Sequence, residues 1–225
     1  MKTRGSKILS REKRFRGFDQ SYFTSHAYED YTERASEEFN RKADRIIATI
    51  HPDPDWTFLD VGCGLAGGCI GPLRKRGFRA EGTDVSDYCL THSPCREWIR
   101  FGEVLSLPFA AQSFDVIVCG ETFLYVHERD IDAGVRELIR VAKHFIVFSL
   151  FDKSSPYASQ QENPDPLRSE AISKLTRKDY EHAFLKRGCS ITSRDIFNRI
   201  PYEEHCFSDV FSVPPSARSS APNRP

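Results

Sequence analysis

Apolar residues recur along this chain with two different periods, which alternate from about residue 31 to residue 213. Between residues 31 and 50, apolar side chains return every three or four positions, which is the spacing of one face of a helix. The sequence His51-Pro52-Asp53-Pro54 ends that helix, because a residue before proline disfavours helical backbone. Two more helices are predicted over residues 129–142 and 176–186.

Short apolar and β-branched runs separate these helices and predict strands. The clearest is residues 114–119, Phe-Asp-Val-Ile-Val-Cys, whose apolar character predicts a central strand buried on both faces. The other predicted strands are residues 57–61, 78–83, 99–104, 144–150, 190–197 and 206–213. Strands that alternate with helices predict an α/β fold, in which helices cover both faces of a mostly parallel sheet.

Composition divides the chain into a central domain and two tails. Residues 1–18 carry seven basic residues and one acidic residue without apolar periodicity, so we expect a disordered basic arm. Residues 214–225, rich in Pro and Ser, are expected to form a disordered tail. Residues 19–213 are predicted to form a single domain with a helical cap over residues 19–52.

Charge and cysteine content narrow the class of protein. The chain of 225 residues has 32 basic and 32 acidic residues, and this zero net charge argues against a strongly basic nucleic-acid-binding module. None of its seven cysteines forms a Cys-x-x-Cys pair, so we predict free thiols in a reducing, cytoplasmic compartment and no metal site. No apolar run is long enough to cross a bilayer, and no membrane association is expected.

A glycine-rich turn follows the predicted strand at residues 57–61 and opens a helix. Its sequence, Leu-Asp-Val-Gly-Cys-Gly-Leu-Ala-Gly-Gly over residues 59–68, lets a ligand approach the backbone without a Cβ atom in the way. The spacing of Gly62, Gly64 and Gly67 also fits a dinucleotide fingerprint. Asp60 argues against NAD, because a carboxylate here would repel a pyrophosphate, and it suits a ligand with an ammonium or sulfonium centre.

Two more acidic residues follow the next two predicted strands. Asp84 lies 22 residues after Gly62, where an acid can accept both ribose hydroxyls of an adenosine. Glu103 follows the third strand, where it can accept an adenine amino group.

These motifs, in this order, resemble the class I S-adenosylmethionine-dependent methyltransferases, and the type 11 group in particular. The resemblance rests on LDVGCGLAGG, Asp84, GEVLSLPF and SFDVIVCGETFLYV, followed by RELIRVAKH and FIVFSL, and it covers residues 55–150. It implies a Rossmann-like, doubly wound sheet of seven strands with the last strand antiparallel. It also implies S-adenosyl-L-methionine as the cofactor.

The resemblance assigns the cofactor site by position. Gly62 and Gly64 would pass under the methionine part, Asp84 would hold the ribose, and Glu103 with the Val104 amide would read the adenine. A tyrosine of the N-terminal segment would reach the methionine carboxylate, and Cys119 would lie beside the methionine portion. The predicted cofactor-binding residues are Tyr22, Tyr31, Asp60, Gly62, Cys63, Gly64, Asp84, Val85, Glu103, Val104 and Cys119. For Tyr31, a place in the core is an equal alternative.

Two residues after the fourth strand are the predicted catalytic residues, Tyr125 and His127. In the family a Leu-Glu-His-Val string is common here, and this chain has Phe-Leu-Tyr-Val over residues 123–126. His127 is the candidate general base, because histidine titrates near neutral pH. The alternative is a surface loop histidine, since aligning the acceptor with a sulfonium methyl group can supply most of the acceleration.

The resemblance leaves the methyl acceptor open. A small molecule, methylated on O, N or C, is the favoured acceptor, for example a secondary metabolite or a sugar, because the chain is compact and has no recognition domain. One alternative is an RNA or protein methyltransferase that uses the basic arm; another is a non-catalytic, cofactor-binding partner subunit. The Asn-Pro-Pro-Tyr string that would indicate planar nitrogens on bases or glutamine is replaced by Cys-Gly-Glu-Thr at residues 119–122.

Overall fold

The structure is a computed structural model that describes residues 15–24, 31–151, 175–200 and 206–215. Residues 1–14 of the predicted arm, most of the predicted tail, and the connection at residues 152–174 lie outside the described residues. No helix of the described part is long and apolar enough to cross a membrane.

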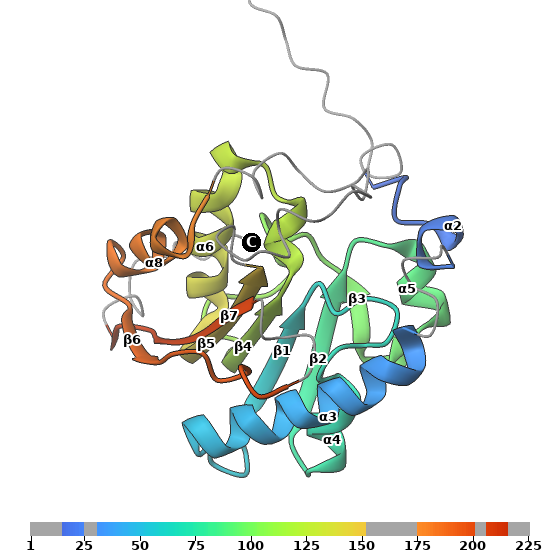
Figure 1. The fold of residues 1–225 in the computed structure, drawn as a ribbon, viewed down its shortest axis with the longest axis horizontal. Helices are drawn as coiled ribbons and strands as arrows, with labels where there is room; N and C mark the ends of the chain where they lie inside the picture. Colours follow the sequence, from blue (N-terminus) through green and yellow to red (C-terminus); the bar gives the residue numbers. More distant parts are fainter. Residues whose placement is uncertain (1–14, 25–30, 152–174, 201–205, 216–225) are drawn as a thin grey trace, which may run out of the picture.

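Seven strands form one sheet in the order β3-β2-β1-β4-β5-β7-β6 (Figure 1). The five strands from β3 to β5 run parallel, and β7 runs antiparallel to both β5 and β6. The strands are β1 (Thr57–Val61), β2 (Arg79–Asp84), β3 (Ile99–Phe101), β4 (Phe114–Gly120), β5 (Ala142–Phe151), β6 (Ser190–Ser193) and β7 (Cys206–Ser212). The predicted seven-stranded sheet with an antiparallel last strand is therefore confirmed.

Helices cover both faces of this sheet. In Figure 1, α3 and α4 lie on one side of the sheet, and α6 and α8 lie on the other. The helices are α2 (Gln20–Phe23), α3 (Tyr31–Ile50), α4 (Ile70–Lys75), α5 (Asp87–His92), α6 (Ile131–Val141) and α8 (Arg177–Leu185). Short 3-10 turns complete the set: η2 (Arg96–Trp98), η3 (Thr122–Tyr125) and η4 (Glu128–Asp130).

The central strand β4 shows why its sequence is apolar throughout. Its neighbours are β1 and β5, and side chains alternate between the two faces of a strand. Ile117 and Cys119 belong to the core under α6 and α8, whereas Val116 and Val118 belong to the core under α3 and α4. Both faces are buried, which matches the prediction made from this run.

The region from residue 87 to residue 98, where the sequence predicts a helix broken at Pro94, divides as expected into α5 and η2. Two predicted strands are shorter in the structure. The strand predicted over 99–104 ends at Phe101, because Glu103 and Ser106 form an isolated bridge of their own. The strand predicted over 190–197 ends at Ser193, and Asp195 then takes left-handed backbone with a φ of 53°.

The end of the predicted basic arm packs on the domain. The Phe15 ring lies 6.2 Å from the Phe101 ring, and the Phe18 carbonyl accepts a 2.6 Å hydrogen bond from the Ser86 hydroxyl. The charge composition of residues 1–18 predicted that Phe15 and Phe18 belong to a disordered arm. In the structure both rings contact aromatic residues of the domain.

Candidate functional site

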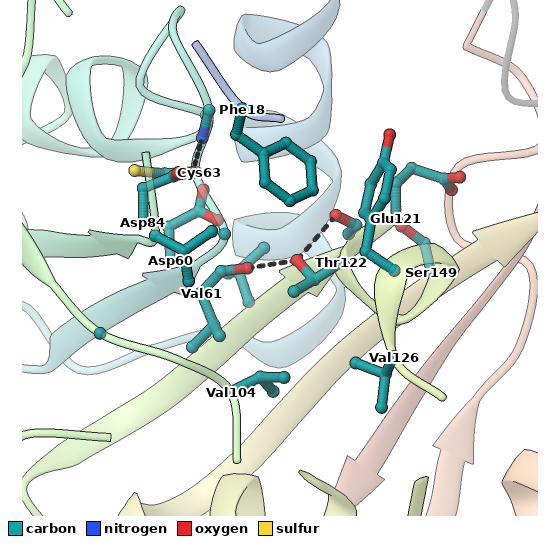
Figure 2. Close-up of a pocket in the computed structure, with 18 of the residues that line it drawn as sticks. Phe18, Asp60, Val61, Cys63, Asp84, Val104, Glu121, Thr122, Val126 and Ser149 are labelled. Atoms are coloured by element: carbon teal, nitrogen blue, oxygen red, sulfur yellow. Dashed lines mark hydrogen bonds between the residues drawn. The ribbon is translucent and has the colours of Figure 1, made fainter. Parts of the chain in front are cut away.

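A cavity of about 570 Å³ opens where β1, β2 and β4 reach their carboxyl ends. This is the edge at which ligands bind in open α/β sheets. Figure 2 draws Asp60, Cys63 and Asp84 on one side of the cavity and Glu121 and Ser149 on the other, with Phe18 between the two sides.

Most of the residues predicted from the sequence line this one cavity. They are Tyr22, Asp60, Gly62, Cys63, Gly64, Asp84, Val85, Glu103, Val104, Tyr125 and His127. They come from the N-terminal segment and from the ends of four strands, so the fold gathers residues that are up to about a hundred positions apart. Their individual roles remain predictions.

Two predicted residues stand apart. Cys119 is 1% exposed and packs in the core with Leu59 and Phe148, and it is absent from the described residues that line the cavity. The sequence prediction for its side chain is not supported, because strand alternation turns Val118 toward the cavity face in its place. Tyr31 begins α3, and its side chain lies outside the described residues.

Asp60 is a buried carboxyl group at the cavity wall. Its Oδ2 accepts a 2.7 Å hydrogen bond from the backbone N–H of Cys69. Burial raises the pKa of Asp60 to about 7, although that hydrogen bond and the ammonium of Lys42 act in the opposite direction. Gly68 leaves room for this carboxyl group, since a Cβ atom there would lie 2.3 Å from Oδ2.

Asp84 ties the glycine turn to the second strand. Its Oδ2 accepts a hydrogen bond from the N–H of Gly64 at 2.8 Å, and its Oδ1 accepts one from the N–H of Ser86 at 2.9 Å. Burial raises the pKa of Asp84, and these backbone bonds partly oppose that rise. Each oxygen has a second lone pair, so the carboxylate can accept further hydrogen bonds from a ligand.

The first glycine of the turn is needed for two separate reasons. Gly62 has a φ of 73°, and a Cβ atom there would lie 2.2 Å from Oγ1 of Thr122. That hydroxyl donates a 2.7 Å hydrogen bond to the Val61 carbonyl, which joins the turn after β1 to the segment after β4. The backbone conformation and the close approach of Thr122 both exclude a side chain.

Three aromatic residues, Phe18, Tyr22 and Tyr125, cover one side of the cavity. The hydroxyl oxygens of Tyr22 and Tyr125 lie 2.7 Å apart and share a hydrogen bond. The Phe18 ring makes edge contacts with both, at 5.4 Å from the Tyr22 ring and 5.1 Å from the Tyr125 ring. The two tyrosines that the sequence assigned to cofactor and catalysis are thus direct partners of each other.

His127 lies exposed at the start of η4. Its Nδ1 accepts a hydrogen bond from the backbone N–H of Arg129 at 3.3 Å, which caps this short turn. In a neutral ring the proton then sits on Nε2, which is a donor and not a base. This geometry favours the alternative of a surface loop histidine over the general base.

Lys42 is a functional candidate that sequence reasoning missed. Its side chain is 8% exposed, its Nζ lies 2.8 Å from the Glu38 carboxylate, and both residues line the cavity. The ammonium also lies over the Phe39 and Phe197 rings, at 5.2 and 5.5 Å. The sequence did contain a signal for Lys42. This lysine lies three residues after Phe39 and four before Ile46, which puts a charged residue on the apolar face of α3.

Glu121 is a second missed residue. It directly follows β4 and lines the cavity, and its φ of 61° is unusual for a residue with a side chain. Its backbone N–H donates a 3.0 Å hydrogen bond to the carbonyl of Ser149, another cavity residue. The sequence signal was a single charged residue in the apolar stretch between Val116 and Val126.

The raised pKa of Asp60 predicts how the stability of the ligand-free protein depends on pH. The folded state keeps the Asp60 proton up to about pH 7, whereas the unfolded state releases it near pH 4, so this group lowers the free energy of unfolding as pH rises between these values. Asp60→Asn should make the decline shallower, while Asp84, raised in the same direction, keeps part of it. Denaturant unfolding at several pH values measures this, with exposed Asp55→Asn as the control. Parallel profiles for Asp60→Asn and the parent would contradict it.

Comparison with known proteins finds one family model and several proteins that are similar to parts of this chain. Residues 59–145 match the family model described as a methyltransferase domain. Norajmaline N-methyltransferase from Rauvolfia serpentina is 29% identical over 108 residues, which are 43% of this chain and 36% of that protein. The chain therefore spans about a third of the length of this curated relative.

Solved structures show the same fold. Magnesium protoporphyrin IX methyltransferase (ChlM) from Synechocystis PCC 6803, solved with bound SAH, has a TM-score of 0.63 and 14% identity over 87% of this chain and 98% of its own. The [4+2]-cyclase SpnF has a TM-score of 0.58 and 16% identity over 78% of this chain and 81% of its own. These likenesses show that the chain has the fold of these proteins, and its residues 59–145 are similar to the methyltransferase-domain family.

Proposed function

We propose that this chain transfers a methyl group from S-adenosyl-L-methionine to a small-molecule acceptor. The observation that carries the proposal is the cavity at the carboxyl ends of the strands. One side of it is lined by the glycine turn and two buried acids, and the other by Glu121 after β4 and Ser149 near the end of β5. A cofactor and an acceptor therefore have adjoining places in one space.

The residues on the first side suit this cofactor. A Cβ atom at Gly64 would meet nothing within 4 Å, so the backbone of the turn is open to a ligand. Asp84 can accept hydrogen bonds from ribose hydroxyls. Glu103 and the backbone at Val104 line the same wall, where an adenine can be read.

An amino acid has two charged ends, and two cavity residues match them. Asp60 can become a negative partner for an amino group, because a bound ammonium favours the ionised carboxylate, and the ammonium of Lys42 offers a positive partner for a carboxylate. The Lys42 ammonium also acts on the Asp60 carboxyl group electrostatically, so the two charges belong to the same neighbourhood. They are the residues that we assign to the methionine part.

The bound cofactor supplies an electrophilic methyl group on a sulfonium. The chain then has to exclude water and hold the acceptor in line with that methyl group. Phe18, Tyr22 and Tyr125 form a cover that is suited to excluding water. The Phe18 ring contacts both tyrosine rings, and the two tyrosine hydroxyls share a hydrogen bond. His127 is exposed and caps η4. We therefore attribute the acceleration of methyl transfer to alignment of the acceptor with the methyl group, and not to a histidine base.

A small acceptor is supported by this cover and by the relatives. A cavity that aromatic residues of the chain itself cover on one side suits a ligand small enough to fit beneath them. Norajmaline N-methyltransferase and magnesium protoporphyrin IX methyltransferase, by their names, act on small molecules.

Calorimetry with S-adenosylhomocysteine, followed by transfer of labelled methyl groups to a panel of small acceptors, tests the proposal. We expect micromolar-range binding, on the order of −8 kcal/mol, and turnover with at least one acceptor. Absence of binding would contradict the enzyme assignment, and tight binding without turnover would favour a partner subunit. Exchanging the seven basic residues before residue 17 for glutamine should leave small-molecule transfer intact; its loss would favour an RNA or protein acceptor.

A further inference from the structure

We propose that the methyl acceptor is an amine, bound with its nitrogen beside the Glu121 carboxylate and its apolar body against the aromatic wall formed by Phe18, Tyr22 and Tyr125. This inference rests on the proposed function and names the acceptor class for the same cavity.

The position of Glu121 is the first observation. The cavity side that carries Asp60 and Asp84 suits the cofactor, and Figure 2 shows Glu121 and Ser149 on the opposite side. Glu121 comes directly after the central strand β4, and Ser149 lies near the end of the adjacent strand β5. A carboxylate therefore stands on the side that is left for the acceptor.

The backbone at Glu121 is held in an uncommon conformation. Left-handed backbone is unfavourable for a residue with a side chain, and such positions cluster at binding sites. The hydrogen bond from the Glu121 N–H to the Ser149 carbonyl fixes the residue in place. Thr122 is committed elsewhere, because its hydroxyl bonds the carbonyls of Val61 and Gly120. The segment after β4 thus presents Glu121 from a rigid base.

The aromatic wall is the second observation. The Phe18, Tyr22 and Tyr125 rings line the cavity and contact one another by their edges, which orders them without a ligand. Aromatic faces attract cations and also bury flat apolar groups. An aromatic wall combined with a carboxylate is the chemistry that recognises a protonated amine. Before transfer the ammonium has to lose a proton, which the Glu121 carboxylate is placed to accept, so that the nitrogen lone pair can form the new bond to the methyl carbon while the methyl–sulfur bond of the sulfonium breaks.

The same chemistry discriminates against other acceptors. A carboxylate or phosphate acceptor would be repelled by Glu121 at short distance. A neutral alcohol would donate a hydrogen bond to the carboxylate but would gain no attraction between opposite charges, so it would bind more weakly than an ammonium group. We therefore expect the site to bind amines most tightly, alcohols less tightly and acids most weakly.

Three ligands with one indole body test this order: tryptamine, tryptophol and indole-3-acetate. Each is titrated into the full chain saturated with S-adenosylhomocysteine at pH 7.5. We expect tryptamine to bind about tenfold or more tightly than tryptophol, and indole-3-acetate to bind most weakly. Equal affinities, a preference for the acid, or no binding of any of the three at millimolar concentration would overturn the proposal.

Variants of Glu121 assign the preference to that residue. Glu121→Gln should remove most of the difference between tryptamine and tryptophol and leave tryptophol binding almost unchanged. Glu121→Asn should do the same, and asparagine tolerates left-handed backbone well. Glu128→Gln is the matched control, because Glu128 is exposed in η4 and is not among the described residues that line the cavity. A preference that survives both Glu121 variants would overturn the assignment.

Binding of S-adenosylhomocysteine separates the two proposals. Variants that bind it normally are folded, and a missing amine preference then counts against the amine proposal alone. If the parent chain does not bind S-adenosylhomocysteine, the proposed function itself fails.

Discussion

Replacing Asp84 by alanine is expected to weaken the binding of S-adenosylhomocysteine by about 2–4 kcal/mol, which is a roughly 30-fold to 1000-fold rise in Kd. The carboxylate is the acceptor that we assign to the ribose hydroxyls. It also holds the glycine turn, through the N–H groups of Gly64 and Ser86. The substitution therefore removes ligand contacts and loosens the backbone that faces the ligand.

Two further variants make the measurement specific. Asp84→Asn keeps one acceptor oxygen and should lose affinity to an intermediate extent. Asp87→Ala removes an exposed acid three residues later, in α5, and should leave the affinity unchanged. Calorimetry on all three compares them directly. An Asp84→Ala protein that binds with the parent's affinity would show that this acid does not hold the ribose.

The second large effect is on stability. Gly62→Ala is expected to lower the free energy of unfolding by about 2–5 kcal/mol. Part of this is the strain of alanine at a φ of 73°, and the remainder is the overlap of its Cβ atom with Oγ1 of Thr122. The threonine cannot turn away freely, because its hydroxyl bonds the Val61 carbonyl.

Gly64→Ala is the matched control for this prediction. Its φ of 65° imposes similar strain, but a Cβ atom there would meet nothing within 4 Å. It should therefore cost about 1–2 kcal/mol. Adding Thr122→Ala to Gly62→Ala should relieve the overlap but not the strain. Denaturant unfolding of the parent, Gly62→Ala, Thr122→Ala and the double variant completes the cycle. Equal losses for Gly62→Ala and Gly64→Ala would mean that Thr122 moves aside without cost.

Prediction from the sequence succeeded where one local pattern determines one local structure. The apolar run of β4, buried between β1 and β5, is such a case. The turn at residues 62–64 is another, since glycine spacing after a strand constrains the backbone directly. Asp60 and Asp84 followed from their positions at strand ends, because parallel strands bring those ends to one edge.

Prediction was less successful where a side chain's neighbours come from distant parts of the chain. Cys119 was assigned to the cavity although strand alternation sends its side chain into the core. Lys42 was missed because it lies on a helix face that the pattern identifies as apolar, and because the Phe197 ring reaches its ammonium only in the folded chain. Charge composition likewise placed Phe15 and Phe18 in a tail, since their contacts with Phe101 and Tyr125 are not local.

Local patterns in the amino-acid sequence are sufficient to predict the α/β class, the strand-by-strand order of the motifs and the two acids, Asp60 and Asp84, that are buried at the cavity wall. Hydrophobic period and glycine spacing act over a few residues, so they can be identified without knowledge of the fold. The tertiary structure is needed to predict which side chains from distant segments meet at the cavity: Tyr22 with Tyr125, Lys42 with Phe197, and Glu121 opposite Asp60. These contacts depend on how helices pack on the two faces of one sheet, and that packing is a property of the whole chain.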